Sequence, residues 1–357
     1  METASNCHCG KSPIYSHEMT HRERVERALH GEKVDRPPVT VWRHFYDRES
    51  SMDGLVDSMI EFQRRFDWDL VKINPRASYH VEDWGLSLKW SQSETCKHEK
   101  LSFPVACPED WDRIVPLPMS SPTLAAHRDA IWRIRKSLGR DIPILMTVFS
   151  PLSLAADLTP SDEFFRDQLR TQRTKVLSAL GAITETFVRF AAEARDAGAD
   201  GIFYATTTWG GRNSISWEEY TAIARDADLR ILGAVEGGLN LLHVCGAESH
   251  LSKMSDYPVD IVNWDDADPT NPPLDRAGEI LGDKVAMGGV DFSGWLRRGA
   301  PPEVSEATRL VARRMRERER FILGPGCAID PETPVENIAA LRRTVDELAT
   351  RGVVYMS

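Results

Sequence analysis

The sequence has 357 residues and a formal net charge of -10, with 41% AVILMFWYC and 27% charged residues. These values are typical of a soluble globular protein that is long enough for one large core. The negative charge and the lack of a basic, aromatic-interleaved stripe argue against nucleic acid as a partner. No run of 18 apolar residues and no signal-peptide core occur, so we expect a cytoplasmic protein that does not contact membranes.

A tail over residues 1–19, which we expect to be disordered or loosely packed, precedes a helix over 20–31 that ends on Gly31. Eight apolar or β-branched segments, bounded by Gly, Pro, Asp or Asn, then predict buried strands. These are residues 38–43, 69–74, 142–149, 201–206, 239–245, 259–264, 284–290 and 320–324. The intervening segments predict helices over 53–66, 121–138, 160–197 (broken), 217–234, 273–281, 303–317 and 334–350.

The alternation of strands and helices indicates a parallel sheet, and eight units indicate closure into a (β/α)₈ TIM barrel. We expect a single catalytic domain over residues 20–357, with an insertion over about 75–120 after the second strand. Within it, residues 79–90 suggest a hairpin that forms a rim or lid. A doubly wound open sheet is the alternative fold, but no Gly-x-Gly-x-x-Gly turn follows any strand.

The fifth predicted strand, LNLLHVC, carries the most informative pair of residues. Residues two apart in a strand share a face, so His243 and Cys245 point the same way and Val244 points oppositely. Barrel active sites form where the carboxyl ends of the strands meet. This spacing therefore predicts that His243 and Cys245 provide two ligands to one metal ion at the mouth of the barrel.

The eighth predicted strand leads through Pro325 and Gly326 to Cys327, which emerges at the same end of the barrel. One imidazole and two thiolates suit zinc, and three protein ligands leave a tetrahedral position open for a substrate thiol. Zinc lowers the pKa of such a thiol, which is otherwise about 8.5. The alternative interpretation is a core histidine with two buried, inert cysteines.

Further polar groups follow other strands, and we expect them to contact substrate or to take part in catalysis. Asp265 and Asp291 are candidates to hydrogen-bond a ligand or to supply an oxygen to zinc, although an Asp after a strand is also a common helix N-cap. The candidate catalytic residues are Asp265, Asp291 and Tyr204, and the candidate substrate-binding residues are Arg43, His44, Asn74, Thr206 and Asn263.

Five other metal-ligand or thiol residues receive no role. Cys7, His8 and Cys9 have ligand side chains but lie in the N-terminal tail, where we expect disorder. Cys96 and Cys107 lie in the polar insertion and are predicted to be ordinary thiols.

Three segments in order resemble landmarks of the uroporphyrinogen decarboxylase-like superfamily. They are RVERALHGEKVDRPPV, HVCG followed by VDIVNWDD, and ILGPGCAIDPETPVENI, and together they cover roughly residues 20–350. Within the superfamily, the chain resembles the zinc-dependent methyltransferases that act with a corrinoid and a thiol such as coenzyme M. Their His-x-Cys and later Pro-Gly-Cys zinc ligands match His243, Cys245 and Cys327.

The resemblance implies a zinc ion and a corrinoid, such as methylcobalamin, as co-substrate or on a separate corrinoid protein. It also implies a small thiol or methylated compound as substrate. The decarboxylase branch fits less well, because Pro325 stands where those enzymes have a porphyrin-binding histidine, and only Arg43 matches their arginine-rich loop. Three alternatives stay open: a metal-independent decarboxylase or lyase, a thiol alkyltransferase with a different electrophile, and a non-catalytic zinc-binding protein.

Overall fold

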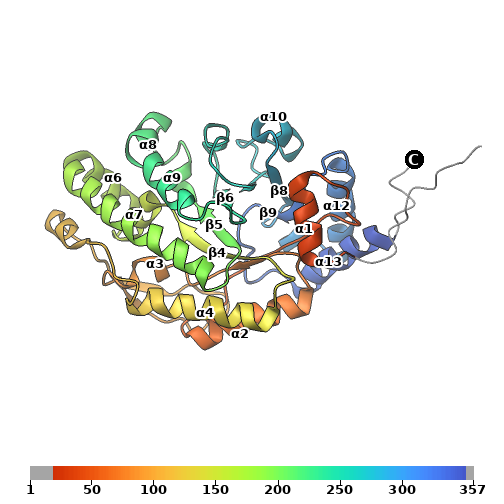
Figure 1. Ribbon diagram of the computed structural model, residues 1–357, viewed down its shortest axis with the longest axis horizontal. Helices are drawn as coiled ribbons and strands as arrows, with labels where there is room; N and C mark the ends of the chain where they lie inside the picture. Colours follow the sequence, from red (N-terminus) through yellow and green to blue (C-terminus); the bar gives the residue numbers. More distant parts are fainter. Residues whose placement is uncertain (1–18, 351–357) are drawn as a thin grey trace, which may run out of the picture.

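Seven parallel strands form the central sheet, in the order β1-β4-β5-β6-β7-β8-β9. The computed structural model describes residues 19–350. The strands are β1 (Val71–Ile73), β4 (Ile144–Phe149), β5 (Gly201–Ala205), β6 (Leu241–Val244), β7 (Ile261–Trp264), β8 (Val285–Val290) and β9 (Phe321–Pro325). Each lies within one residue of a segment predicted to be a strand, and helices surround the curled sheet (Figure 1).

Residues 38–43 lie between β9 and β1, the two ends of this sheet. On one side the Thr40 N–H donates to the Leu323 carbonyl at 3.0 Å, and on the other the Asp69 N–H donates to the Val39 carbonyl at 2.9 Å. The segment therefore takes the first strand position of a (β/α)₈ barrel, and the predicted fold is confirmed. Its pairing with β9 and the segment after it consists of the isolated bridges Val39 to Leu323 and Arg43 to Ile329.

Helices cover the outer face of the barrel, with α2 packed against α4, α7 against α9, and α12 against α13 (Figure 1). In residues 19–350, no helix is long and apolar enough to cross a membrane. The helices are α1 (His21–His30), α2 (Met52–Phe66), α3 (Tyr79–Glu82), α4 (Pro122–Leu138), α5 (Pro151–Asp157), α6 (Asp162–Thr171), α7 (Arg173–Asp196), α8 (Trp217–Ile223), α9 (Arg225–Gly233), α10 (Ala277–Leu281), α11 (Trp295–Arg298), α12 (Pro301–Arg314) and α13 (Val335–Thr350).

Side chains alternate between two apolar clusters along each strand, as the pleat requires. On β5, Phe203 belongs to an inner cluster of strand residues, whereas Ile202 belongs to the larger cluster shared with the outer helices. Val25 of α1 packs against the inner cluster as well. The first helix therefore closes the amino-terminal end of the barrel, and the opposite end remains for the site.

The segment between β1 and α4 contains α3, a short hairpin and a 3₁₀ turn (Pro108–Arg113). The hairpin pairs β2 (Ser87–Lys89) with β3 (Glu99–Ser102), so its second strand lies beyond residues 79–90, where the hairpin was predicted. The first part of that range is α3, which ends at Glu82. Gly85 follows three residues later and has a φ of 109°. A glycine tolerates this positive φ, so the chain can turn from helix to strand there.

Candidate metal centre

His243 lies near the carboxyl end of β6 and faces the barrel interior. Its ring centroid is 5.2 Å from that of Phe203, a member of the inner cluster, and its side chain is buried. Cys245 follows the last residue of β6, and the alternation along the strand sends its half-buried side chain to the same side. The two-residue spacing thus presents one imidazole and one thiol together.

Cys327 reaches the same point from β9 through a tight turn. A Cβ on Gly326 would lie 2.7 Å from the Cα of Asp265, so the turn passes this backbone only because residue 326 has no side chain. The Cys327 Sγ lies 3.5 Å from the Cys245 Sγ and 3.8 Å from the His243 Nε2. The three ligand atoms all lie within 4.8 Å of one another.

Asn263 of β7 fixes the orientation of the imidazole. Its Nδ2 donates to the carbonyls of Met287 and Pro325, at 3.0 Å each, so its Oδ1 is directed at the His243 Nδ1, 2.6 Å away. An oxygen at this distance accepts a hydrogen bond, which places the imidazole proton on Nδ1 and leaves the Nε2 lone pair facing the two thiols. The buried amide therefore selects the tautomer that a metal ligand needs.

Thr206, at the end of β5, anchors the backbone of the same histidine. Both its N–H, at 3.0 Å, and its hydroxyl, at 3.2 Å, donate to the His243 carbonyl. Thr206 is fully buried and its hydroxyl is engaged in this bond. The sequence predicted that Thr206 and Asn263 bind substrate, but both side chains support His243 in the structure.

The two thiols share a hydrogen bond, and their pKa values shift in opposite directions. The contact with Cys245 holds the pKa of Cys327 well below its usual value, and the nearby His243 adds to this effect. The same contact with Cys327, together with burial, raises the pKa of Cys245 well above its usual value. The pair is therefore poised to lose a first proton readily and to release the second only when a cation takes its place.

Two of the three distances between the ligand atoms match those around a zinc ion. Ligand atoms about 2.0–2.3 Å from zinc at tetrahedral angles lie about 3.5–3.8 Å apart. The measured 3.5 Å between the sulfurs and 3.8 Å between Cys327 Sγ and His243 Nε2 agree with this geometry. Nitrogen and thiolate ligands also have the softness that zinc prefers over magnesium or calcium.

Two aspartates predicted to be catalytic lie at the same end of the barrel. Asp265 follows β7 beside the Cys327 turn, and burial raises the pKa of its carboxyl, with the charges of Asp268, Cys327 and Asp291 acting in the same direction. The Asp291 Oδ1 accepts from the Gly294 N–H at 2.7 Å and caps the turn that leads into α11. Asp291 therefore stabilises this turn, but the N-cap residue of α11 is Gly294, and a catalytic role for Asp291 stays a prediction.

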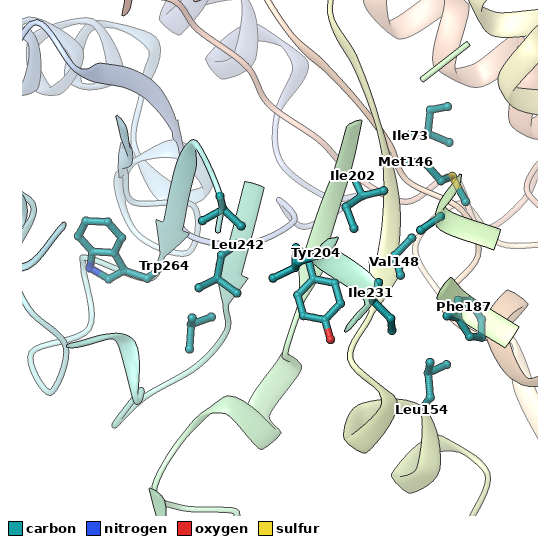
Figure 2. Close-up of a cluster of buried hydrophobic side chains, with 14 of the residues drawn as sticks. Ile73, Met146, Val148, Leu154, Phe187, Ile202, Tyr204, Ile231, Leu242 and Trp264 are labelled. Carbon is teal, nitrogen blue, oxygen red and sulfur yellow. The ribbon is translucent and has the colours of Figure 1, made fainter. Parts of the chain in front are cut away.

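Tyr204 lies on the opposite face of the sheet from the three ligands. Its hydroxyl donates to Asp228 of α9 at 2.5 Å, and Figure 2 shows its ring beside Ile231, in the cluster between strands and helices. Tyr220 and Tyr257 also donate to this carboxylate. The structure therefore does not bring Tyr204 to the site, and its contacts are those of a core network.

Of the remaining predicted residues, Arg43 contacts the loop of the hairpin, whereas His44 and Asn74 contact residues outside it. Arg43 forms an ion pair with Glu94 at 2.8 Å, and the His44 Nδ1 lies 3.2 Å from the Glu49 Oε2. Asn74 is buried at the end of β1 and accepts a hydrogen bond from Lys72.

Lys72 was not predicted from the sequence, although its position carried a signal. It is the one charged residue within LVKI, residues 70–73, and it shares a face of the strand with Leu70 and Asn74. Leu70 belongs to the inner cluster, so this parity points into the barrel.

Comparison with known proteins agrees with this architecture. The uroporphyrinogen decarboxylase (URO-D) family model matches residues 20–348. Methylcobamide:CoM methyltransferase MtaA of Methanosarcina barkeri is 28% identical over 229 residues, which is 63% of this chain and 64% of the relative. Methylcobamide:CoM methyltransferase MtbA of Methanosarcina acetivorans is 23% identical over 347 residues, which is 90% of this chain and 96% of the relative.

Among solved structures, a methyltransferase from Methanosarcina mazei superposes with a TM-score of 0.75 at 20% identity, covering 92% of this chain and 99% of that one. This likeness shows a shared barrel fold. The family match runs from α1 into α13 and includes every strand of the barrel. The chain belongs to the uroporphyrinogen decarboxylase family.

Proposed function

We propose that this protein is a zinc-dependent methyltransferase that moves a methyl group between a corrinoid and a thiol activated at His243, Cys245 and Cys327. The observation that carries the proposal is the convergence of one imidazole nitrogen and two thiol sulfurs, with the imidazole tautomer set by Asn263. The methylcobamide:CoM methyltransferases among the relatives support a corrinoid-linked methyl transfer.

The donor set supports a catalytic centre in preference to a structural one. In residues 19–350, the three ligands form a group without a fourth His, Cys, Asp or Glu side chain at ligand distance. A zinc ion held by three protein ligands has an open position, at which it lowers the pKa of an incoming thiol. Structural zinc sites are usually complete, so this arrangement favours the enzyme over a non-catalytic zinc-binding protein.

The residues of the chain have separate tasks in the proposed reaction. His243, Cys245 and Cys327 hold the metal, and Asn263 and Thr206 hold His243 in place. A corrinoid would supply the methyl group without its bonding electron pair, and the thiol held at the triad would form the new carbon–sulfur bond and release its proton to solvent. Because the chain itself is a single barrel over the described residues, we propose that the corrinoid is carried by a separate protein or is free in solution.

Metal analysis tests the ligand assignment. We expect about one zinc per purified chain and expect Cys327→Ser to lose it while keeping the circular dichroism spectrum of the wild type. Cys96→Ser, which alters an exposed cysteine of the hairpin loop, is the matched control and keeps the zinc. A variant with both Cys7→Ser and Cys9→Ser also keeps it. Full zinc content in Cys327→Ser would refute the assignment.

Activity is then tested with methylcobalamin and a panel of small thiols, by following the conversion of methylcobalamin to cob(I)alamin spectroscopically. The wild type is expected to demethylate methylcobalamin only when a thiol is present, and Cys327→Ser is expected to be inactive. A zinc-loaded protein that transfers no methyl group to any thiol, but alkylates thiols with another electrophile, would replace the corrinoid part of the proposal.

A further inference from the structure

The fold holds the sulfur atoms of Cys245 and Cys327 in contact. The two Sγ atoms lie 3.5 Å apart, although the residues are separated by 82 positions in the sequence. A disulfide has a sulfur–sulfur bond of about 2.05 Å, so the two atoms need to approach each other by about 1.5 Å to form one. The barrel therefore supplies in advance the proximity that a reaction between two distant thiols requires.

The backbone beside Cys245 leaves room for this approach. Gly246 follows it with a φ of 82°, and a Cβ at this glycine would be 3.6 Å from its nearest neighbour, a methyl group of Thr208. Gly326, on the other side, passes so close to Asp265 that Cys327 is held in place. Because glycine has the widest range of backbone angles, the adjustment falls on Gly246 and on rotation of the Cys245 side chain.

Both thiols are accessible to a small molecule. Cys245 and Cys327 are half-buried at the mouth of the barrel, and neither lies in the closed core. A cysteine that is fully buried in apolar surroundings is inert, whereas a partly exposed one reacts with oxidants. The site that admits a substrate thiol therefore also admits a molecule as small as hydrogen peroxide.

The other cysteines that the structure describes have different neighbours. The Sγ of Cys96 is 4.0 Å from the Thr95 hydroxyl, and the Sγ of Cys107 donates to the Asp110 carboxylate at 3.3 Å. Both residues are exposed. Within residues 19–350, Cys245 and Cys327 are the one pair of thiols in contact, so oxidation of Cys96 or Cys107 has no adjacent sulfur with which to close a disulfide.

We propose that Cys245 and Cys327 form an oxidation site, at which a hydroperoxide converts the two thiols of the metal-free protein into a reversible disulfide. One thiol attacks a peroxide oxygen, the oxygen–oxygen bond breaks, and a sulfenic acid and water form. The second thiol attacks this sulfur, the sulfur–sulfur bond forms, and a second water leaves. The two sulfurs lose two electrons, the two peroxide oxygens gain them, and both thiol protons end in water.

The disulfide and a metal ion compete for the same two sulfurs. Metal binding requires both cysteines as thiolates, and a disulfide leaves His243 as the remaining ligand of the triad. A bound metal therefore protects the thiols, and oxidation of the metal-free protein prevents reloading. The consequence for methyl transfer rests on the proposed function, whereas the disulfide itself depends only on the two thiols.

Peptide mapping by mass spectrometry tests the oxidation site. Chelator-treated protein receives one equivalent of hydrogen peroxide, and the remaining thiols are then alkylated. We expect a linked pair of peptides that contain Cys245 and Cys327 and that dithiothreitol separates. The link is expected to form more than about 10-fold faster than Cys96 or Cys107 is oxidised, because the two reacting sulfurs are already in contact.

Serine variants provide the controls. The sequence has six cysteines, so a variant with serine at the other four positions retains Cys245 and Cys327 alone and is expected to lose both free thiols on oxidation. Cys96→Ser is the matched single control and forms the linked pair, whereas Cys245→Ser does not. Zinc-loaded protein is expected to form the link at least about 10-fold more slowly and to release its zinc as it does so, which a chromophoric chelator measures.

These measurements need no enzyme activity, so the oxidation site and the proposed function can fail separately. Free, alkylated Cys245 and Cys327 after peroxide treatment of the metal-free protein, or links from either residue to another cysteine in place of this pair, would overturn the oxidation site. A linked pair supports it even in a protein that transfers no methyl group. Where methyl transfer is present, peroxide treatment of the metal-free protein is expected to block its recovery on addition of zinc, and dithiothreitol to restore it.

Discussion

Replacement of Asn263 by leucine tests whether its hydrogen bond to His243 contributes to metal binding, without changing His243 itself. The amide is fully buried and its oxygen lies 2.6 Å from His243 Nδ1, while its nitrogen bonds two carbonyls from β8 and β9. Leucine has a similar volume but no acceptor for the imidazole proton. The tautomer with its proton on Nε2, which cannot bind a metal through that nitrogen, then competes with the tautomer protonated on Nδ1. The imidazole ring is also free to rotate.

The expected loss of zinc affinity is about 10- to 100-fold, the usual effect of removing the hydrogen-bond partner of a metal-bound histidine. This corresponds to about 1.4–2.7 kcal/mol of binding free energy. The free energy of unfolding is expected to fall as well, by about 1–3 kcal/mol for each carbonyl that loses its donor. Competition with a chromophoric chelator at pH 7 measures the first quantity, and urea unfolding of the metal-free protein measures the second.

Asn240→Leu is the matched control, because Asn240 is a buried asparagine that immediately precedes β6, at the opposite end of this strand from Cys245. Its Oδ1 accepts from the Ile202 N–H and its Nδ2 donates to the Val235 carbonyl. We expect this variant to lose stability without a change in zinc affinity. If Asn263→Leu binds zinc as tightly as Asn240→Leu does, the imidazole orientation does not depend on the amide and the reasoning is refuted.

Three further predictions concern the framework around the site. Burial alone lowers the pKa of His21, but hydrogen bonds to Asp67 and Asp69 raise it to about 9, above its unfolded value of about 6.5. The stability that His21 gains from the two aspartates is therefore fully present below pH 6.5 and is lost as the pH rises to 9. His21→Gln should remove that part of the pH dependence of urea unfolding. Asp69→Asn removes the carboxylate that Arg24 and Arg36 share, while Arg24 keeps its ion pair with Asp35, and should cost about 3 kcal/mol in urea unfolding with full zinc content retained; a loss below about 1 kcal/mol would contradict the role of this carboxylate. Tyr204→Phe removes one hydrogen bond to Asp228 and should lower the unfolding free energy by about 1.5–3 kcal/mol without changing kcat or zinc content, whereas a catalytic Tyr204 would lower kcat.

The barrel was predictable because each buried strand of a parallel sheet is a short apolar run between turn residues. Seven of the eight predicted runs are regular strands. The remaining run, residues 38–43, forms isolated bridges instead. The predicted helix over 160–197 divides at Gln172 into α6 and α7, a break that its sequence also indicated. The prediction was weakest in the insertion, where α3 forms from residues assigned to a hairpin.

The sequence did not always show which face of a strand each side chain points to, and this limited the prediction of the site. Polar residues on β6 made the face shared by His243 and Cys245 recognisable, because the neighbouring positions are apolar. On β5, the segment GIFYAT is apolar on both faces, so nothing in it showed that Phe203 points inward and Tyr204 outward. The tyrosine therefore looked like a strand-end group, although its partner is an aspartate on α9.

The partners of buried polar groups were not predictable because they come from distant parts of the chain. Asn263 hydrogen-bonds groups on β6, β8 and β9 at once, and only the closed barrel brings those strands to one point. Cys327 gained its assignment from the resemblance to a family, because a turn of Pro-Gly-Cys has no intrinsic direction.

The metal ligands and the groups that cover the rim belong to different halves of the barrel. The ligands and their supports come from β5, β6, β7 and β9, whereas the hairpin contacts the other side, through Glu94 on Arg43 and through Trp90 on Arg76. Changes in the hairpin can therefore alter which molecule enters without disturbing the triad. Lys72 and Asn74 lie on β1, on the half that the hairpin covers. One barrel can therefore keep His243, Cys245 and Cys327 unchanged while the residues on its other half vary.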